Sequence, residues 1–434
     1  MVAGALLLLK RKKERRWEKE VLRLKFLRRI TKLKTKRLLM LISSVCLTLV
    51  LVALLIPACA PAAPEEVAEE IAELEAKLTA EKANVKGLES EVSDLEDEIA
   101  ALKKPAEVLK WKPSCWASAG IHWRDLGNIC DYITEASDGR IVAEPTLPGA
   151  LCSVPEQIEF VSTGATPAMF LYFDYWSGKV PIYAVASNAL HVLYKPWQVI
   201  QYLQYEDNGR VLELTRQETD KHYPGIHIVT PVTAGREYCA TASTVPIYGI
   251  EDIPGIKYRT GATADAAAWE SFGAATTWFP GTECYTSLAT GVVDAISYAS
   301  ASDYLEMGWD DVTDYWIREP YTQDTMAYWF AVNEAEWSKL SDDLRVIVST
   351  AVEAANMYAL YDSDKVNAEA WEIAEERGIE VIDWSDEDIV AYQKALLDAS
   401  EELCSDAASQ EALQILRDFL IKYEPGIAEL AGLM

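Results

Sequence analysis

The chain has 434 residues, half of them hydrophobic, with 40 basic and 68 acidic side chains and a formal net charge of −28. This composition excludes a collagen-like or mostly disordered chain. Residues 1–38 hold 15 Lys and Arg against three Glu, whereas the rest of the chain holds 25 basic and 65 acidic residues. The part of the chain after residue 38 is so acidic that it would repel phosphate backbones, which argues against nucleic-acid binding by the bulk of the chain.

An uncharged run of 19 residues follows the basic leader and is just long enough to cross a bilayer. The charges on either side predict a cytoplasmic leader at 1–38, a signal or transmembrane segment at 39–58, and an extracytoplasmic location for everything beyond. The run ends in Leu-Ile-Pro-Ala-Cys-Ala, which resembles a bacterial lipobox with Cys59 as the lipid-attachment residue. Two interpretations stay open, cleavage before Cys59 or an uncleaved signal anchor. A third is that the leader itself binds nucleic acid or anionic lipid.

Residues 65–104 are predicted to form a coiled-coil stalk. Apolar residues recur there in alternating steps of three and four for about five heptads, between Pro64 and Pro105. At about 1.5 Å per residue, such a helix would be about 50 Å long. A single helix of this kind leaves its apolar seam in water, so we expect it to form a homo-oligomer or to fold onto the next domain.

The body, residues 106–434, is too long for one ordinary core and predicts two lobes. Strand and helix patterns alternate through it, which indicates an α/β fold. The predicted strands are 108–115, 141–146, 167–173, 226–232, 255–260, 276–279, 292–297, 327–333 and 379–382. The predicted helices are 121–136, 154–163, 264–272, 283–290 and a long region at 334–358.

The sequence lacks the common motifs of enzymes. Its four His residues show no metal-ligand spacing, and there is no Gly-rich phosphate loop and no GxSxG motif. We therefore expect no metal, no cofactor and no catalysis. Disulfides and buried free thiols are both compatible with the six cysteines of the body, Cys115, Cys130, Cys152, Cys239, Cys284 and Cys404.

The passage from Ile250 to Ala295 carries a family resemblance. It runs through IEDIPGIKYRTG, FGA and GTECYTSLATGVVDA. This resembles the "DLkGlKiR", "lGa" and "EvYtALqtGvvDg" pattern of the DctP-type solute-binding proteins of TRAP (tripartite ATP-independent periplasmic) transporters. Further agreement comes from DGRI at 138–141, YWSGKVP at 175–181, and Asn333 with Trp337 and Leu340. The resemblance covers most of residues 106–400, and the YWSGKVP piece is most similar to the branch that binds 2-oxo acids.

The resemblance implies a two-lobed, periplasmic-binding-protein-like (type II-like) α/β fold with hinge strands and a long connecting helix. It places residues 106–233 and 323–363 in lobe one, and residues 234–322 and 364–434 in lobe two. It also implies a receptor on the extracytoplasmic face of a bacterial cell membrane. Such a receptor captures a carboxylate-containing organic acid between its lobes and delivers it to the membrane permease subunits.

The resemblance also implies the ligand-binding residues. Arg259 matches the Arg that pairs with the ligand carboxylate, and a guanidinium offers two parallel hydrogen bonds that a Lys cannot copy. We expect Arg259→Ala to abolish binding with little effect on thermal unfolding. Arg236 falls where some members place a second Arg, although an ion pair with a neighbouring acid is the alternative for either residue. The predicted aromatic wall consists of Tyr298, Tyr172, Phe173, Tyr175 and Trp176, with packing in a lobe core as the alternative.

Other interpretations remain beside the transport receptor. Relatives that bind a cation with a 2-oxo acid carry an acidic residue where this chain has Ser297, so we expect no bound cation. The same body could serve as a membrane-anchored ligand sensor that signals through its coiled coil. A hydrolase or lyase would need clustered acid and base groups, which the sequence does not offer. The solute class is open, and the aromatic content favours a monocarboxylate with an apolar tail.

Overall fold

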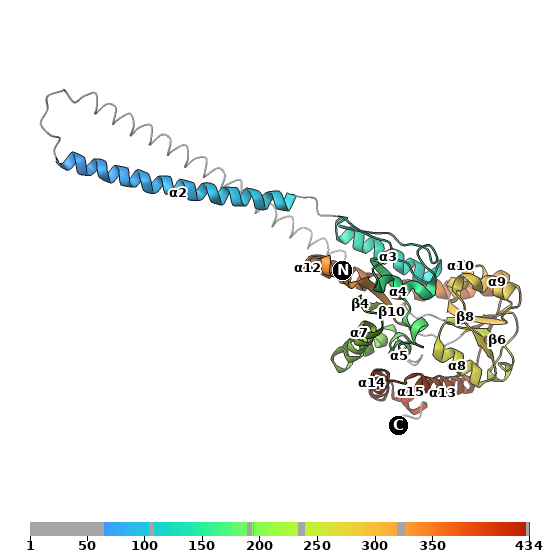
Figure 1. The fold of residues 1–434 in the computed structure, drawn as a ribbon. Helices are drawn as coiled ribbons and strands as arrows, with labels where there is room; N and C mark the ends of the chain where they lie inside the picture. Colours follow the sequence, from blue (N-terminus) through green and yellow to red (C-terminus); the bar gives the residue numbers. More distant parts are fainter. Residues whose placement is uncertain are drawn as a thin grey trace. The chain divides into compact units, whose positions relative to one another are not determined.

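The computed structural model describes residues 65–103, 108–188, 193, 195–232, 239–318, 326–430 and 434 (Figure 1). The predicted leader at 1–38, the predicted membrane segment at 39–58, Cys59 and Arg236 lie outside these residues. Within the described part of the chain, no helix has both the length and the apolar character needed to cross a membrane. The chain divides into two units, Met1–Glu107 and Val108–Met434.

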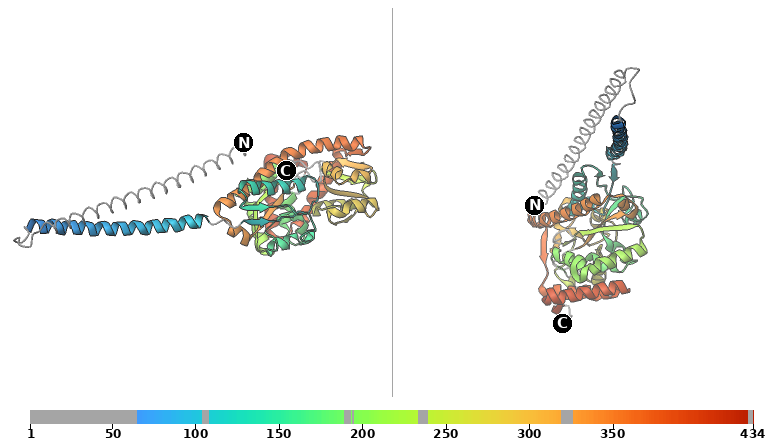
Figure 2. Two further views of the ribbon diagram at one scale, coloured as in Figure 1. Left: turned by 90° about the horizontal axis from the view of Figure 1, so that it is seen from above. Right: turned by 90° about the vertical axis from the view of Figure 1, so that its left-hand side faces the viewer.

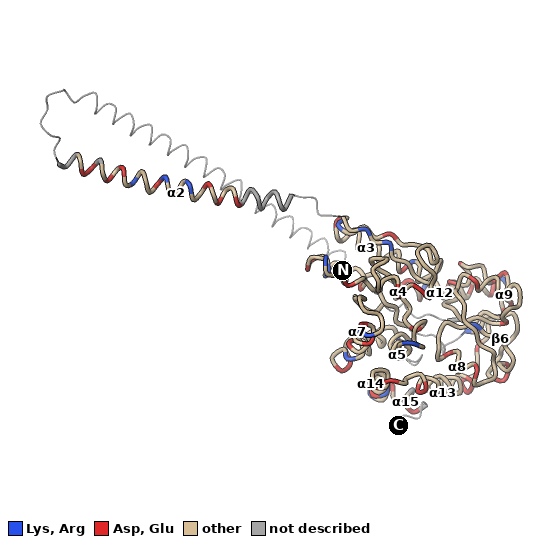
Figure 3. The backbone as a smooth tube through the Cα atoms, viewed as in Figure 1, with Lys and Arg blue, Asp and Glu red and all other residues tan. Residues whose placement is uncertain are grey.

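The described part of the first unit is one helix of 39 residues, α2 (Glu65–Lys103), where the sequence predicts a helical stalk. Its composition is dominated by Ala, Glu, Leu and Lys, which favour helix formation. Lys77 pairs with Glu73 one turn earlier at 2.6 Å, and acidic and basic residues are interspersed along the helix (Figure 3). Leu74 of the expected seam is 50% exposed. Pairing of this helix with another copy stays a prediction.

The second unit contains two α/β halves, mainly green and mainly yellow in Figures 1 and 2. In the first half, lobe one, β1 pairs with β2 in parallel, and β3, β10 and β4 form an antiparallel sheet. A hydrogen bond of 3.0 Å from Phe170 N to Ser114 O joins the two sheets. The elements of lobe one are β1 (Leu109–Trp111), α3 (Gly120–Ala136), β2 (Ile141–Ala143), η1 (Val154–Glu156), α4 (Gln157–Ser162), β3 (Ala168–Leu171), η2 (Phe173–Trp176), α5 (Ile182–Asn188), α6 (Pro196–Ile200), η4 (Gln201–Tyr205), η5 (Glu206–Gly209), α7 (Arg210–His222), β4 (Ile226–Val232), β10 (Tyr328–Asn333) and α11 (Glu334–Lys339).

Lobe two is built on a six-stranded sheet with the order β11-β9-β5-β8-β6-β7. Strand β5 runs antiparallel to its neighbours β8 and β9, while the other adjacent pairs are parallel. The elements of lobe two are β5 (Cys239–Ser243), η6 (Ile250–Asp252), β6 (Lys257–Arg259), α8 (Thr263–Ser271), β7 (Ala275–Thr277), η7 (Gly281–Glu283), α9 (Cys284–Ala289), β8 (Ala295–Ser300), α10 (Ala301–Glu306), η8 (Trp309–Asp311), β9 (Tyr315–Arg318), β11 (Glu380–Asp383) and α13 (Asp386–Leu403).

The long helix α12 (Asp342–Glu376) contacts both lobes, through α3 and β4 on one side and α10 and β11 on the other. The long helical region predicted at 334–358 is in fact two helices, because Leu340 and Ser341 adopt extended backbone between α11 and α12. Helix α14 (Ala407–Tyr423) packs on α5 and α7, and α15 (Pro425–Leu430) packs on α14. The apolar face of α14 therefore joins the core of lobe one, although the prediction gave the C-terminal residues to lobe two.

Three hydrophobic clusters lie within the second unit. One is centred on the helical side of lobe one, another on lobe two, and the largest includes residues of both lobes.

Between the two predicted states of the cysteines, the structure favours free thiols. Burial raises the pKa of Cys115 to about 12 and that of Cys284 to about 11, so these groups are poor nucleophiles. The cysteines that are buried as free thiols are Cys115, Cys130, Cys152, Cys284 and Cys404.

Candidate functional site

Arg259 is the last residue of β6, a strand between β8 and β7 in lobe two. Its side chain turns inward and is only 1% exposed. The guanidinium donates from Nε and Nη2 to the carbonyl oxygen of Phe279, at 3.1 and 2.7 Å, and from Nη1 to that of Ser297 at 2.9 Å. These bonds fix the plane of the group and leave a second proton on each terminal nitrogen for another acceptor.

None of the ion pairs among the described residues includes Arg259, whose guanidinium contacts backbone carbonyls and the rings of Phe279 and Tyr298. A buried charge without a counter-charge is costly, so the site favours an anion that supplies one. The described residues therefore do not form the internal ion pair that was the alternative role for Arg259. The three carbonyl bonds also bear on the expected Arg259→Ala phenotype. Ala would leave the Phe279 and Ser297 oxygens without these donors, so some loss of stability should accompany the loss of binding.

Tyr298 lies beside this guanidinium. Its ring centroid is 5.4 Å from Cζ of Arg259, and the ring also packs against Gly281, where a Cβ atom would come within 2.3 Å of it. The Tyr298 hydroxyl is buried and has no hydrogen-bond partner among the described residues, and the same holds for Oγ of the neighbouring Ser297. Burial raises the pKa of Tyr298 well above its ordinary value. It therefore stays a neutral hydroxyl that can donate to an acceptor bound next to Arg259.

The aromatic residues predicted on lobe one occupy different environments. Tyr175 is half-buried and reaches the Arg259 side chain, and burial raises its pKa to about 12 although Arg259 acts to lower it. Tyr172 meets Tyr175 edge to face at 5.0 Å and donates to Oδ1 of Asn188 at 2.6 Å. Phe173 instead stacks on Tyr183 and Trp329 and has no exposed surface.

Trp176 is nearly buried and donates from Nε1 to the carbonyl oxygen of Pro155 at 3.0 Å. Of the aromatic residues named from the sequence, Tyr175 and Tyr298 therefore lie at the guanidinium, and Tyr172 lies one ring behind Tyr175. Phe173 packs in the core of lobe one, which was the alternative to a place in the aromatic wall.

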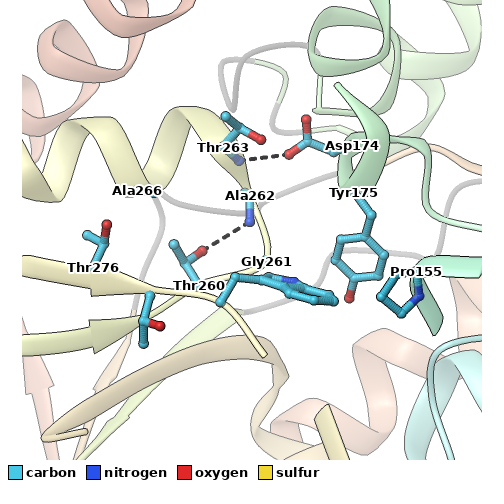
Figure 4. Close-up of a pocket in the computed structure, with 11 residues that line it drawn as sticks. Pro155, Asp174, Tyr175, Thr260, Gly261, Ala262, Thr263, Ala266 and Thr276 are labelled. Atoms are coloured by element: carbon cyan, nitrogen blue, oxygen red, sulfur yellow. Dashed lines mark hydrogen bonds between the residues drawn. The ribbon is translucent and has the colours of Figure 1, made fainter. Parts of the chain in front are cut away.

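A cavity of about 310 Å³ opens where the two lobes meet (Figure 4). Lobe one contributes Pro155, Asp174 and Tyr175, whose hydroxyl points toward the cavity in Figure 4. Lobe two contributes the segment after β6, the start of α8 and the end of β7. The lining residues are Pro155, Asp174, Tyr175, Thr260, Gly261, Ala262, Thr263, Ala266, Thr276, Thr277 and Trp278.

Two acidic side chains, Asp174 and Asp303, accept hydrogen bonds across the boundary between the lobes. Asp174 of lobe one accepts a 2.8 Å hydrogen bond from Thr263 N, the first residue of α8 in lobe two. In the opposite sense, Asp303 of lobe two accepts a 2.9 Å bond from Ile121 N near the start of α3 in lobe one. A carboxylate is favourable at either helix N-terminus. Burial nevertheless raises the pKa of Asp174 to about 6, against the lowering effect of its hydrogen bonds.

Several of these residues were missed by sequence reasoning. Asp174 is a lone acid within a run of aromatic residues, and such an isolated charge in an apolar segment was a usable signal. Trp278 is next to last in the predicted strand 276–279 and directly follows β7, at the end of the strand where a binding site is expected. Asp303 carried no signal, because its partner on α3 is 182 residues away in the sequence.

The described arrangement defines a class of protein. Two α/β lobes joined by a long helix meet at a cavity, and beside it lies a buried guanidinium with donors beyond its backbone bonds. This is the architecture of a two-lobed solute-binding protein. Residues 115–406 match the family model DctP, bacterial extracellular solute-binding protein, family 7. The chain belongs to this family.

Known proteins agree with this assignment. A solute-binding protein of Albidiferax ferrireducens is 24% identical over 62% of this chain and 77% of its own length. A monocarboxylate 2-oxoacid-binding periplasmic protein of Nostoc sp. is 22% identical over 67% of this chain and 78% of its own. The solved TRAP solute-binding protein of Pseudoalteromonas atlantica, with bound sodium and pyruvate, has a TM-score of 0.63 at 20% identity and covers 75% of this chain and 98% of its own. That of Bordetella bronchiseptica, with calcium and picolinate, has a TM-score of 0.65 at 17% identity and covers 75% and 95%.

Proposed function

We propose that this protein is the extracytoplasmic receptor of a TRAP-type transporter and binds a monocarboxylate through Arg259. The observation that carries the proposal is the buried Arg259 guanidinium, which has donor protons beyond its three carbonyl bonds and no carboxylate partner among the described residues. The Tyr175 hydroxyl shares these donors. Two parallel charge-assisted hydrogen bonds suit a ligand carboxylate. Relatives whose ligands are named also support a carboxylate, since one binds monocarboxylate 2-oxo acids and others hold pyruvate or malonate.

Tyr298 and Tyr175 would complete the anion site. The Tyr298 hydroxyl, which has no partner in the described part of the chain, gives a ligand oxygen a neutral donor, and Tyr175 approaches from the other lobe. A ligand bound between these residues contacts both lobes, so it favours the arrangement in which they meet and shifts the population toward it. The strongly acidic chain repels anions at long range. Arg259 must therefore act at short range, inside a site screened from the surface charge.

The remaining parts of the proposal concern location and partners. Cys59 or the segment at 39–58 would anchor the chain to the membrane, and α2 would carry the body away from it as one member of a coiled coil. Integral permease subunits would take the solute from the receptor. Arg236 is proposed as a second contact to the carboxylate, and Ser297 in place of an acid supports binding without a cation.

A thermal-shift screen of the full chain against organic acids tests the proposal. The panel contains pyruvate, malonate, orotate and galacturonate, with sodium chloride as the ionic control. A ligand that binds only the folded state at 100 times its Kd stabilises by about 2.7 kcal/mol. For a body of this size, that corresponds to a rise in Tm of roughly 2–4 °C. Absence of any shift in a folded sample, or an equal shift for Arg259→Lys, would contradict the proposal.

A further inference from the structure

Trp278 presents a large apolar surface to the cavity between the lobes, where it is 39% exposed. It follows β7 of lobe two, and its ring meets Tyr175 of lobe one at 5.4 Å and 65°. This contact joins the lobes through two aromatic rings. These two aromatic rings and the apolar ring of Pro155 line the cavity of about 310 Å³. Flat apolar walls suit a planar apolar group.

Gly261 lies between this cavity and the anion site. A Cβ atom at Gly261 would stand 3.2 Å from Cε1 of Tyr175, 3.6 Å from its hydroxyl and 3.7 Å from Nη1 of Arg259. The residue also lines the cavity. The position that a side chain would fill is therefore next to both the guanidinium and the aromatic walls. Glycine leaves open the short path from one to the other.

The polar groups of the cavity select against a second negative charge on the ligand. Among the described residues, Asp174 is the only charged one that lines it, and its buried carboxylate accepts from Thr263 N. The other polar side chains of this lining are neutral threonine hydroxyls and the Tyr175 and Trp278 rings, with no Lys or Arg from the described chain. A second carboxylate placed there would meet Asp174 without a cation to balance it.

We propose that this cavity, between Tyr175, Trp278 and Pro155, is a specificity subsite for the planar apolar tail of a monocarboxylate whose carboxylate is held by Arg259. The inference rests on the proposed function and names its substrate class as aromatic or similarly flat 2-oxo or simple monocarboxylic acids. Gly261 is the passage for the chain of atoms that links carboxylate and tail. Trp278 determines specificity through the tail and does not contact the carboxylate.

The test compares pyruvate with phenylpyruvate, which share the 2-oxo carboxylate and differ only in the phenyl group. Isothermal titration calorimetry is run on the full chain, with the same buffer and detergent throughout. We expect phenylpyruvate to bind at least tenfold more tightly than pyruvate, since the ring gains buried area and aromatic contacts. Trp278→Ala should weaken phenylpyruvate about tenfold and change pyruvate less than twofold. Gly261→Ala should also weaken phenylpyruvate more than pyruvate.

Trp197→Ala is the matched control, because Trp197 lies on α6 and is 62% exposed away from the cavity. It should change neither affinity. Equal binding of the two acids, or an equal loss of both in Trp278→Ala, would overturn the tail subsite while leaving binding at Arg259 intact. Failure of the unaltered chain to bind either acid would instead refute the carboxylate receptor together with the subsite.

Discussion

Arg259→Lys isolates what the fork of the guanidinium contributes to binding. The substitution keeps a positive charge at the end of β6 but offers a single ammonium in place of two parallel donors. Losing one charge-assisted hydrogen bond to a ligand costs about 1.5–3 kcal/mol, which predicts a Kd for pyruvate that is roughly 10- to 100-fold higher. Lys also replaces the bonds to Phe279 and Ser297 only in part. The free energy of unfolding should therefore fall by about 1–2 kcal/mol.

Calorimetry with pyruvate and denaturant unfolding, at one ionic strength, measure the two effects of Arg259→Lys separately. Arg216→Lys is the matched control, since Arg216 on α7 also donates from Nη2 to a backbone carbonyl, that of Ile228 at 3.1 Å. The control should lose a similar amount of stability and no affinity. A pyruvate Kd for Arg259→Lys within threefold of the unaltered chain would refute bidentate recognition by this residue.

Three further predictions concern groups around the site. Tyr298→Phe should weaken pyruvate about tenfold by calorimetry yet leave denaturant stability unchanged, because its buried hydroxyl has no partner among the described residues; a loss of stability without loss of affinity would contradict it. Burial raises the pKa of Asp265 from 3.8 to about 6, so its stabilising contribution is present below pH 3.8 and lost as the pH rises through 6. The free energy of unfolding therefore declines between these pH values, and Asp265→Asn should remove roughly 1–3 kcal/mol of the decline. Denaturant unfolding at a series of pH values measures it, and the same pH dependence in both proteins would refute the prediction. Asp303→Ala should cost about 1–3 kcal/mol in denaturant unfolding, because the carboxylate accepts from both Ile121 N and Ser300 N; an unchanged midpoint would exclude this double capping role.

The sequence predicted best where a local pattern and its tertiary environment agree. Strand 226–232 has the predicted bounds, and helix α3 differs by one residue at its start. At β8 the prediction of 292–297 is three residues early, because the turn after α9 continues through Val293 and the strand begins at Ala295. The helices between β3 and β4 were not predicted, and their short, interrupted form includes positive φ at Asp207 and Asn208, which no simple periodicity describes.

The site followed a similar division. Arg259 was identified from a motif confined to one strand, and its burial could not be known from that strand alone. Its environment is made by Phe279 and Ser297, which come from neighbouring parts of the sheet. Phe173 and Tyr175 both lie in η2, but Phe173 faces the lobe core and Tyr175 faces the cavity. The sequence pattern did not distinguish these two directions. The contact between Tyr175 and Trp278 depends on how the lobes meet, which no local pattern specifies.

The contacts between the lobes bear on how a ligand acts. Asp174 caps α8 across the cavity, and Asp303 with Glu306 accepts from the first turn of α3, where Gly120 N lies 2.9 Å from Glu306 Oε2. These bonds form between protein groups alone, so part of the free energy that favours closed lobes is present before a solute binds. The ligand has to supply only the remainder, through its bonds to Arg259 and its contacts with lobe one. Weakening the Asp303 cap, which does not line the cavity, should therefore lower the affinity for every ligand by a similar factor, whereas changes at Trp278 should discriminate between them.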